Sequence, residues 1–447
     1  MSSGGAVMAR ISDGVASFTA AEWDACAGAG NPFVSHAFLS ALEESGSATA
    51  ARGWQPVPIS IEGADGALAG VMPAYAKSHS QGEYVFDQGW ADAWTRAGGD
   101  YYPKLQIAVP FSPVPGPRLL ARDPALKPAL VAAAEALVRE HDLSSAHATF
   151  ISEEDRALFE SAGWLMRADR QFHFTNEGYG SFDDFLEALA SRKRKGIRKE
   201  RAAAVEGLEV RHLTGAELTE AHWDAFWHFY QDTGARKWGR PYLTRKFFSL
   251  LGERMADKLL LILAFRGGKP IAGALNLIGA DTLYGRYWGA TEDVPFLHFE
   301  LCYYQGMPRS RADCAPSRRA RRAGTSLPAA MRRWRHGRRT SSPIRASATP
   351  SPTIWRRSAR RSPTISRRWR RWSPSGGDDP GRGGSMPGAG RIGQPGTGLA
   401  LGLRDLARAH LPGDLGPAFL PPDEAAERRQ VEPLVRLDKV DVDALAA

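Results

Sequence analysis

Residues 258–290 read KLLLILAFRGGKPIAGALNLIGADTLYGRYWGA, and this stretch contains three runs rich in aliphatic and aromatic residues. Glycine-containing turn sequences at residues 266–269 and 279–281 separate the runs. Short apolar runs joined by such turns are typical of successive antiparallel strands. The stretch therefore predicts a three-stranded antiparallel meander.

Helical patterns flank this meander on both sides. Residues 181–206 begin with Ser181, followed three residues later by an acid, which is a capping-box pattern. Residues 221–241 and 243–257 carry apolar residues at helical spacing, and a further helix is expected to begin at residue 296. An antiparallel sheet with helices before and after it belongs to the α+β class.

Residues 20–145 repeat the same plan. The hairpin text IEGADGALAGVMPAYA in this part matches AFRGGKPIAGALNLIG in the second part, and each has Ala-Gly shortly after the turn. A long-period duplication explains the match. The elements expected in this part are helices at 20–28, 36–45 and 124–141, a hairpin at 56–77 and a proline-interrupted strand at 102–120.

The positive charge of the chain is concentrated in one segment. The formal net charge is +9, but Pro308–Trp372 contains 20 Arg and one Asp with no Lys or Glu, which is +19. The remaining residues together therefore carry −10. The body of the chain reads as an acidic globular protein, and the high pI belongs to the basic segment.

Cysteine spacing and the N-terminus predict a cytoplasmic protein. Cys26, Cys302 and Cys314 lie far apart, so the sequence suggests neither a disulfide framework nor a zinc site. The N-terminus lacks the apolar core of a signal peptide, and no run is long enough to span a bilayer. We expect no stable membrane insertion and no metal.

Four stretches resemble a bacterial family of N-acyltransferases, the GNAT proteins related to Fem-type peptidoglycan aminoacyl transferases. They are HSQGEYVFDQGWADAW (79–94), YYPKLQIAVPFSPVPGPRLL (101–120), YGRYWGATEDVPFLHFELCYYQ (284–305) and the SRKRKGIRKER helix (191–201). The resemblance covers roughly residues 10–307. It implies a double GNAT fold and transfer of an acyl or aminoacyl group to a small-molecule or cell-wall-precursor amine.

The domain organisation expected from this likeness is two tandem GNAT-like domains, each a mixed, mostly antiparallel sheet flanked by helices. A flexible N-terminus at 1–15 precedes a first domain at 16–175 and a second at 176–307. The second domain is expected to be incomplete. The rest of the chain, 308–378 and 379–447, is expected to be largely disordered.

Acyl transfer to an amine needs a base, a proton donor and groups that hold the donor. On the strand expected at 283–290, Tyr284, Arg286 and Trp288 alternate and should share one face. Tyr284 is a candidate catalytic residue there, and Arg286 and Trp288 are candidates for substrate binding. The alternative for Trp288 is a place in the core.

The helix expected after that strand supplies further catalytic candidates. His298 is the candidate base, with Glu300 as an alternative base or as its orienting partner. Tyr303 or Tyr304 is the candidate proton donor to the leaving group. The alternative is that Tyr303 belongs to the core and His298 is a half-buried histidine with its hydrogen bonds satisfied.

In the first half, four charged residues lie within aromatic and proline-rich text and are candidates for substrate binding. Charges in such surroundings often line a cleft, although an ion pair that supports a loop is nearly as common. They are Glu83, Asp87, Lys104 and Arg118.

The donor is either an acyl-CoA or an aminoacyl-tRNA. The usual pyrophosphate loop of acyl-CoA enzymes has no clean match, which weakens acetyl-CoA and leaves charged tRNA open. On the basic helix at 191–201, Arg194, Lys195 and Arg198 are candidates for contacts with donor phosphates. The alternative is a solvated basic surface.

The Arg-rich segment has a composition that packing does not explain. Pro308–Trp372 contains no Val, Lys, Glu, Phe, Tyr, Asn or Gln. Codons for Thr325–Pro343 can be chosen so that the adjacent frame reads HKLARGYAPVETWSAHFIA, the text expected of the family. Pro363–Asp379 likewise yields ADYLAAMAALVAFRRG and a stop codon. This pattern indicates a frameshift near residue 307 followed by a read-through tail.

Two interpretations of the segment remain. On the frameshift reading, the second domain lacks its last strands and a helix, so the chain as written should have low stability and little or no acyltransfer. On the alternative reading, residues 308–372 act as a nucleic-acid-binding arm through phosphate neutralisation and tryptophan stacking. Any peptide so rich in Arg should bind nucleic acid non-specifically.

Overall fold

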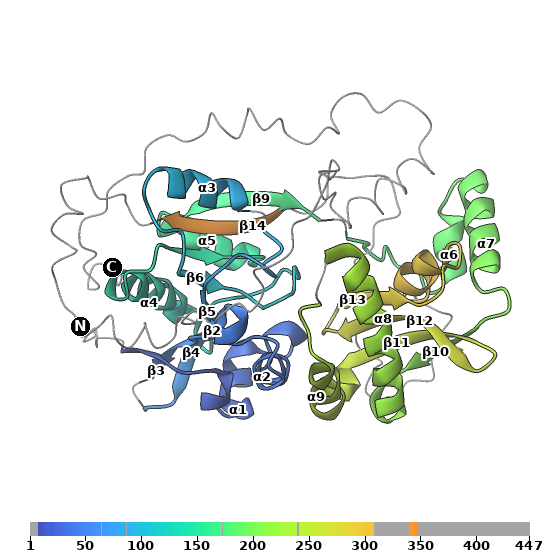
Figure 1. Ribbon diagram of the computed structural model, residues 1–447, viewed down its shortest axis with the longest axis horizontal. Helices are drawn as coiled ribbons and strands as arrows, with labels where there is room; N and C mark the ends of the chain where they lie inside the picture. Colours follow the sequence, from blue (N-terminus) through green and yellow to red (C-terminus); the bar gives the residue numbers. More distant parts are fainter. Residues whose placement is uncertain are drawn as a thin grey trace, which may run out of the picture. The chain divides into compact units, whose positions relative to one another are not determined.

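The computed structural model describes residues 8–63, 65–85, 87–171, 173–238, 241–307 and 339–346 (Figure 1). All of these residues fall within one compact unit. The architecture is α+β, with antiparallel and mixed sheets flanked by helices, as predicted from the sequence. The boundary between residues 175 and 176 stays a prediction.

The first half contains two sheets. One has the strand order β1–β3–β4–β7 and is antiparallel, with strands Ala9–Ile11, Ile59–Glu62, Leu68–Met72 and Leu120–Ala121. The other has the order β2–β5–β6–β8–β14–β9, with strands Trp54–Pro56, Ala74–Lys77, Lys104–Ile107, Ser145–Ala148, Arg339–Ala346 and Leu165–Arg170. Within it, β6 and β8 run parallel to each other.

Helices cover these sheets, and local sequence explains where they begin. Thr19 accepts a hydrogen bond from the Glu22 backbone in a capping box at the start of α1. Ser152 caps α5 in the same manner through the Asp155 backbone N–H. The helices of this half are α1 (Ala20–Ala27), α2 (His36–Glu44), α3 (Gln88–Arg96), α4 (Lys127–Glu140) and α5 (Glu153–Ser161).

The second half is built on the predicted meander. Its sheet has the order β10–β11–β12–β13, with strands Glu209–Leu213, Leu259–Arg266, Lys269–Ile278 and Leu283–Ala290, all antiparallel. Its helices are α6 (Phe182–Glu187), α7 (Ser191–Ala204), α8 (Glu220–Trp238) and α9 (Arg245–Met255). The predicted capping box at Ser181 is present and starts α6.

The matching hairpins of the two halves share an irregularity. In β3–β4 the register shifts between Ile61 and Glu62, and in β11–β12 it shifts between Ala264 and Phe265. The two sites occupy the same position in the matched hairpin text. β-bulges are retained features rather than defects. The shared shift supports the predicted duplication.

The last helix before residue 308 differs from the sequence expectation. After a single turn, α10 (Leu297–Phe299), the chain continues as a π-helix, η7 (Glu300–Tyr304). π-helical turns are uncommon and often occur at functional sites. The turn redirects the side chains that follow His298, so their spacing is not that of an ordinary α-helix.

Strand β14 lies inside the segment for which the sequence predicts disorder. It pairs with β8 through Ser145–His147 and with β9 through Leu165–Arg170, so it separates these two strands (Figure 1). For these eight residues the structure has a strand instead. The predicted disorder of the remaining residues of 308–447 lies outside the described residues.

A shared hydrophobic core joins the two halves. The Phe38 ring of α2 packs edge-on against the Phe247 ring of α9, with centroids 5.7 Å apart. The Phe33 ring makes the same kind of contact with Tyr284 of β13, at 5.4 Å. Aromatic pairs of this geometry add to the stabilisation from area burial. The second half therefore depends on the first for part of its core.

Glu43 of α2 makes the stability of the first half depend on pH. Its Oε2 accepts a hydrogen bond of 2.8 Å from the Val15 backbone, and burial raises its pKa from 4.5 to about 7. The folded state therefore holds a proton that the unfolded chain releases. The stabilisation is complete below pH 4.5 and is lost as the pH rises through 7.

We expect Glu43→Gln to remove this pH dependence, which should amount to about 3 kcal/mol in unfolding free energy. Urea titrations at pH values from 4.5 to 8 measure it. Glu44→Gln is the control, because the exposed Glu44 pairs with Arg254 and has a lowered pKa. If the unfolding free energy of Glu43→Gln changed with pH as steeply as that of the unchanged chain, Glu43 would not be the source of the pH dependence.

Candidate functional site

Strand β13 does not present Tyr284, Arg286 and Trp288 on one face, so that prediction is wrong. Leu275 pairs with Tyr287, but the next residue of β12, Asn276, pairs with Gly285. Arg286 is therefore the extra residue of a β-bulge. A bulge breaks the two-residue alternation of a strand and re-aims its side chains.

The bulge divides the three candidates. Tyr284 belongs to the core shared with the first half, and burial raises its pKa. Trp288 lies on the opposite face of the sheet, where its ring packs edge-on against His298 with centroids 5.2 Å apart. Arg286 points to the first half, where its Nη2 donates a 2.5 Å hydrogen bond to the carbonyl of Phe111.

His298 lies in an aromatic cluster on the Trp288 face. Its ring is 5.5 Å from that of Phe299 and 5.7 Å from that of Tyr303, centroid to centroid. Burial raises the pKa of Tyr303 to about 12 and that of the neighbouring Tyr304 above its usual range as well. Both phenols therefore keep their protons at neutral pH, as a proton donor must.

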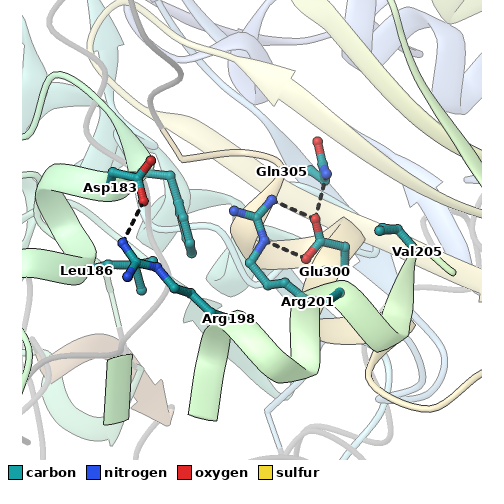
Figure 2. A pocket seen from close by; sticks show the side chains of 9 residues that line it. Asp183, Leu186, Arg198, Arg201, Val205, Glu300 and Gln305 are labelled. Atoms are coloured by element: carbon teal, nitrogen blue, oxygen red, sulfur yellow. Dashed lines mark hydrogen bonds and ion pairs between the residues drawn. The ribbon is translucent and has the colours of Figure 1, made fainter. Parts of the chain in front are cut away.

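Glu300 is held in a bidentate ion pair. Arg201 donates from Nε and Nη2 to the two carboxylate oxygens at 2.8 and 2.7 Å, and Gln305 Nε2 donates to Oε1 at 2.5 Å (Figure 2). Glu300 is 1% exposed. Because its oxygens already accept three hydrogen bonds, the geometry favours a structural or orienting role over proton transfer.

A cavity of about 320 Å³ opens beside this ion pair. It brings together Glu300 and Arg198, two candidates that the sequence does not connect (Figure 2). Arg198 Nη2 lies 3.2 Å from Asp183 Oδ1, and both side chains are largely exposed. The lining residues are Phe182, Asp183, Leu186, Arg198, Arg201, Ala202, Val205, Glu300 and Gln305.

The other cations of α7 lie along the same helix. Ile197 and Ala204 form its buried side, whereas Arg194 is half-buried and Lys195 is exposed. The arrangement is that of a basic face on a helix anchored by few apolar residues. It fits a phosphate-binding surface and a solvated surface equally well.

The structure brings three of the first-half candidates together. Lys104 Nζ lies 2.9 Å from Glu83 Oε2 and 2.5 Å from Asp87 Oδ2. Ser80 accepts a further hydrogen bond from the same ammonium group at 2.9 Å. The Asp87 carboxylate also accepts a hydrogen bond from Tyr101 at 3.0 Å. Every charge of this cluster has a partner of opposite sign.

Sequence reasoning missed one member of the cluster, Lys77. It pairs in register with Lys104 across β5 and β6, its Nζ lies 3.6 Å from the centroid of the Trp54 ring, and burial lowers its pKa to about 7. A lysine at the end of the buried run MPAYAK was the available signal.

Glu83, Asp87 and Lys104 are 3%, 1% and 0% exposed. A substrate cannot reach groups that are so deeply buried without local opening. The geometry therefore favours the second interpretation, an ion network that supports the surrounding loop.

Arg118 lies apart from this cluster and is fully buried. Its guanidinium donates to the carbonyls of Val114 and Pro117, at 2.9 and 3.1 Å, while the Arg118 backbone N–H donates to Asp155. It therefore braces the proline-rich loop, in agreement with the structural interpretation.

The described residues contain neither a metal-site cluster nor a membrane-spanning helix. Among them, no group of His, Cys, Asp and Glu side chains has the arrangement of a metal site. None of their helices is long and apolar enough to cross a membrane.

The model of the FemAB-like family, described as peptidoglycan biosynthesis/recognition, matches residues 14–312. No curated protein sequence matches the chain.

Several solved structures are similar to the chain at low identity. A conserved protein of unknown function from Bacteroides thetaiotaomicron has 11% identity and a TM-score of 0.44, over 76% of this chain and 100% of that one. A tandem GNAT protein from the clavulanic acid biosynthesis pathway has 9% identity and a TM-score of 0.38, over 77% of this chain and 100% of that one. L-PGS from Bacillus licheniformis has 10% identity and a TM-score of 0.36, over 61% of this chain and 70% of that one.

The Arg201–Glu300 pair predicts a large stability effect. Arg201→Met removes the guanidinium, whose Cζ lies 4.0 Å from the centroid of the Phe182 ring, and leaves the Glu300 carboxylate buried without its cation. We expect a loss of about 3 kcal/mol in urea unfolding. Adding Glu300→Gln should restore most of that loss, because no unpaired charge then remains.

Arg198→Met is the matched control on the same helix. It removes only the exposed pair with Asp183, so its cost should stay below about 1 kcal/mol. Equal losses in the two single variants would show that burial of the Glu300 pair is not what stabilises this turn.

Proposed function

Because the chain belongs to the FemAB-like family, we propose that it transfers an acyl or aminoacyl group from an activated donor to an amine acceptor. The observation that carries this proposal is the family match over residues 14–312. The family description, peptidoglycan biosynthesis/recognition, makes an amine of a cell-wall precursor the acceptor that fits best. The donor is an acyl-CoA thioester or an aminoacyl-tRNA ester.

The proposed reaction forms one C–N bond and breaks one C–S or C–O bond. The ammonium group of the acceptor gives a proton to a base, and its nitrogen then attacks the donor carbonyl carbon. The nitrogen of the tetrahedral intermediate then gives up a second proton, and the intermediate collapses as the thiolate or the ribose oxygen leaves and takes up a proton from the proton donor, which the second proton restores. A base and a proton donor near one carbonyl carbon therefore satisfy the chemistry.

In this proposal His298 is the base and Tyr303 the proton donor. Their rings lie 5.7 Å apart, His298 on the α10 turn and Tyr303 on the π-helix that follows it, and the raised pKa keeps the Tyr303 phenol protonated. The ion pair of Glu300 with Arg201 holds the π-helix that carries Tyr303 and directly follows the turn with His298. Tyr284 lies across the sheet from them and is assigned no proton transfer.

The basic face of α7 is the proposed donor-phosphate site. The cavity beside Arg198 and Arg201 offers two guanidinium groups at its wall. A phosphate bound there would replace the exposed Asp183 as the partner of Arg198, because a guanidinium binds phosphate strongly. It would leave the ion pair of Arg201 with Glu300 intact.

The chain as written is proposed to be impaired, because the text after residue 307 departs from the family. Strand β14 overlaps the codons for which the adjacent frame reads SAHFIA, an apolar run suited to a central strand. In the frame as written, the strand includes Pro343, which has no backbone N–H to donate to its neighbours. Residues 339–346 therefore occupy the position of a strand, but their sequence is poorly suited to one.

The impairment is tested by restoring the frame after residue 307. We expect the restored chain to be monodisperse in gel filtration and to unfold cooperatively, whereas the chain as written should aggregate, because sheet edges would be left without well-matched partners. Calorimetry of the two chains measures the difference. Equal cooperativity in both would count against the impairment.

The transfer itself is tested in the restored chain, since a segment so rich in Arg is expected to bind tRNA regardless of function. We expect Arg194→Gln, Lys195→Gln and Arg198→Gln together to weaken tRNA binding. The slope of the logarithm of the binding constant against the logarithm of the salt concentration should become shallower by about 2 to 3. Transfer from charged tRNA should fall in parallel, measured with a radiolabelled amino acid and an amine acceptor.

Lys246→Gln, Lys258→Gln and Lys269→Gln remove three exposed cations of the same half and serve as the control. Transfer from an acyl-CoA, with no effect of the α7 changes on tRNA binding, assigns the donor as the thioester. No transfer from either donor in the restored chain would reject the proposed function.

A further inference from the structure

The guanidinium of Arg286 has no counter-ion in the part of the chain that the structure describes. Among the described residues, no carboxylate lies within ion-pairing distance of its guanidinium, and its hydrogen-bond acceptor is the neutral carbonyl of Phe111. Arg201 and Lys104, by contrast, are paired with carboxylates. Removing a cation from water without compensation is costly, so a half-buried Arg without a carboxylate is an unusual feature of a folded chain.

Aromatic side chains from both halves surround this guanidinium. Its Cζ lies 4.7 Å from the centroid of the Tyr287 ring and 5.4 Å from that of Tyr84. Tyr230 of α8 packs edge-on against Tyr287 at 5.7 Å. Tyr84, Tyr230 and Arg286 are each partly exposed, whereas Tyr287 lies beneath them, 7% exposed. The cluster therefore has an accessible side and a buried floor.

The floor contains polar atoms with no partner among the described residues. They are Arg286 Nε and Tyr287 Oη, and Thr233 Oγ1 is a third buried atom of this kind. Thr233 lies three residues after Tyr230 on α8 and so shares its face of the helix. Buried donors are nearly always satisfied, so a group of orphans calls for an explanation.

The backbone on the first-half side of the cluster is strained. Tyr84 and Phe111 both have positive φ values of 57°, which is uncommon for residues other than glycine. These are the residues that place a phenol ring and a carbonyl against Arg286. Such strain persists only where surrounding contacts impose it, and it concentrates at ligand sites.

We infer that Arg286, with the phenols of Tyr84 and Tyr287, binds a carboxylate group of a ligand between the two halves. A guanidinium and phenol hydroxyls are all donors, and a carboxylate accepts up to about four hydrogen bonds. One cation matches one negative charge, so a monoanionic carboxylate fits better than a phosphate dianion. The site is incomplete without the first half, which supplies Tyr84 and holds the guanidinium at Phe111.

The inference rests on the proposed function only in regarding this carboxylate as part of the acceptor. Binding itself needs no acyltransfer. The β-bulge is what aims Arg286 at this site, while Trp288, two residues later, faces His298 on the other side of the sheet. The carboxylate would thus anchor a remote part of the acceptor rather than the reacting amine.

Saturation-transfer NMR on the full chain tests the site with N-acetylglycine as the probe. Its uncharged amide is the matched neutral probe, and inorganic phosphate is the second anion. We expect saturation transfer and saturable binding for N-acetylglycine, at least about tenfold weaker binding for the amide, and no competition by equimolar phosphate. Equal binding of the amide, or no binding of N-acetylglycine, overturns the inference.

Two variants locate the binding. Arg286→Gln should abolish it, and Tyr84→Phe, which removes only a hydroxyl and leaves the Phe111 hydrogen bond, should weaken it about threefold to tenfold. Arg266→Gln is the control, because this exposed Arg at the end of β11 pairs with Glu292. Should Arg286→Gln fail to fold, unchanged binding in Tyr84→Phe still overturns the site.

The outcomes separate this inference from the proposed function. Binding of N-acetylglycine that depends on Arg286, in a chain that transfers nothing from either donor, keeps the site and rejects the acyltransfer. Transfer that proceeds with unchanged kinetics in Arg286→Gln, together with no carboxylate binding, rejects the site and keeps the function.

Discussion

One extra residue in strand β13, Arg286, decides which way the polar and aromatic side chains of that strand point. With the bulge at Arg286, Tyr287 faces α8 and the shared core, while Trp288 faces His298 of α10. The guanidinium itself turns to the carbonyl of Phe111. An uninterrupted ladder would put Arg286 and Trp288 on the same face, and the two environments would not be separate.

The buried cations of the chain differ in how their charge is compensated. Lys104 and Arg201 lie in closed networks, where carboxylates and neutral groups occupy their donors. Such networks cost desolvation and return it through pairing, so they hold a loop or a turn in place. The guanidiniums of Arg286 and Arg118 both donate to neutral carbonyls, but Arg118 is fully buried, whereas Arg286 is partly exposed, as a site completed from outside requires.

The duplicated plan has produced halves with different tasks. Both carry the same hairpin with its register shift, at Ile61 and at Ala264. The first half uses its strands to bury an ion network and to supply Tyr84 and Phe111, whereas the second adds the π-helical turn and the basic helix α7. Joint aromatic packing, such as Phe33 with Tyr284, then makes them one core.

The sequence by itself determined the local elements: the meander at 258–290, the capping box at Ser181 and the matching hairpins follow from turn residues and periodicity. It also named Glu83, Asp87 and Lys104 as candidates, which the structure brings together. Only the tertiary structure decided the faces of β13 and the isolation of Arg118, because a bulge and a buried loop arise from packing between distant segments. Periodicity extends only as far as an uninterrupted ladder, and charge compensation is a property of neighbours in space.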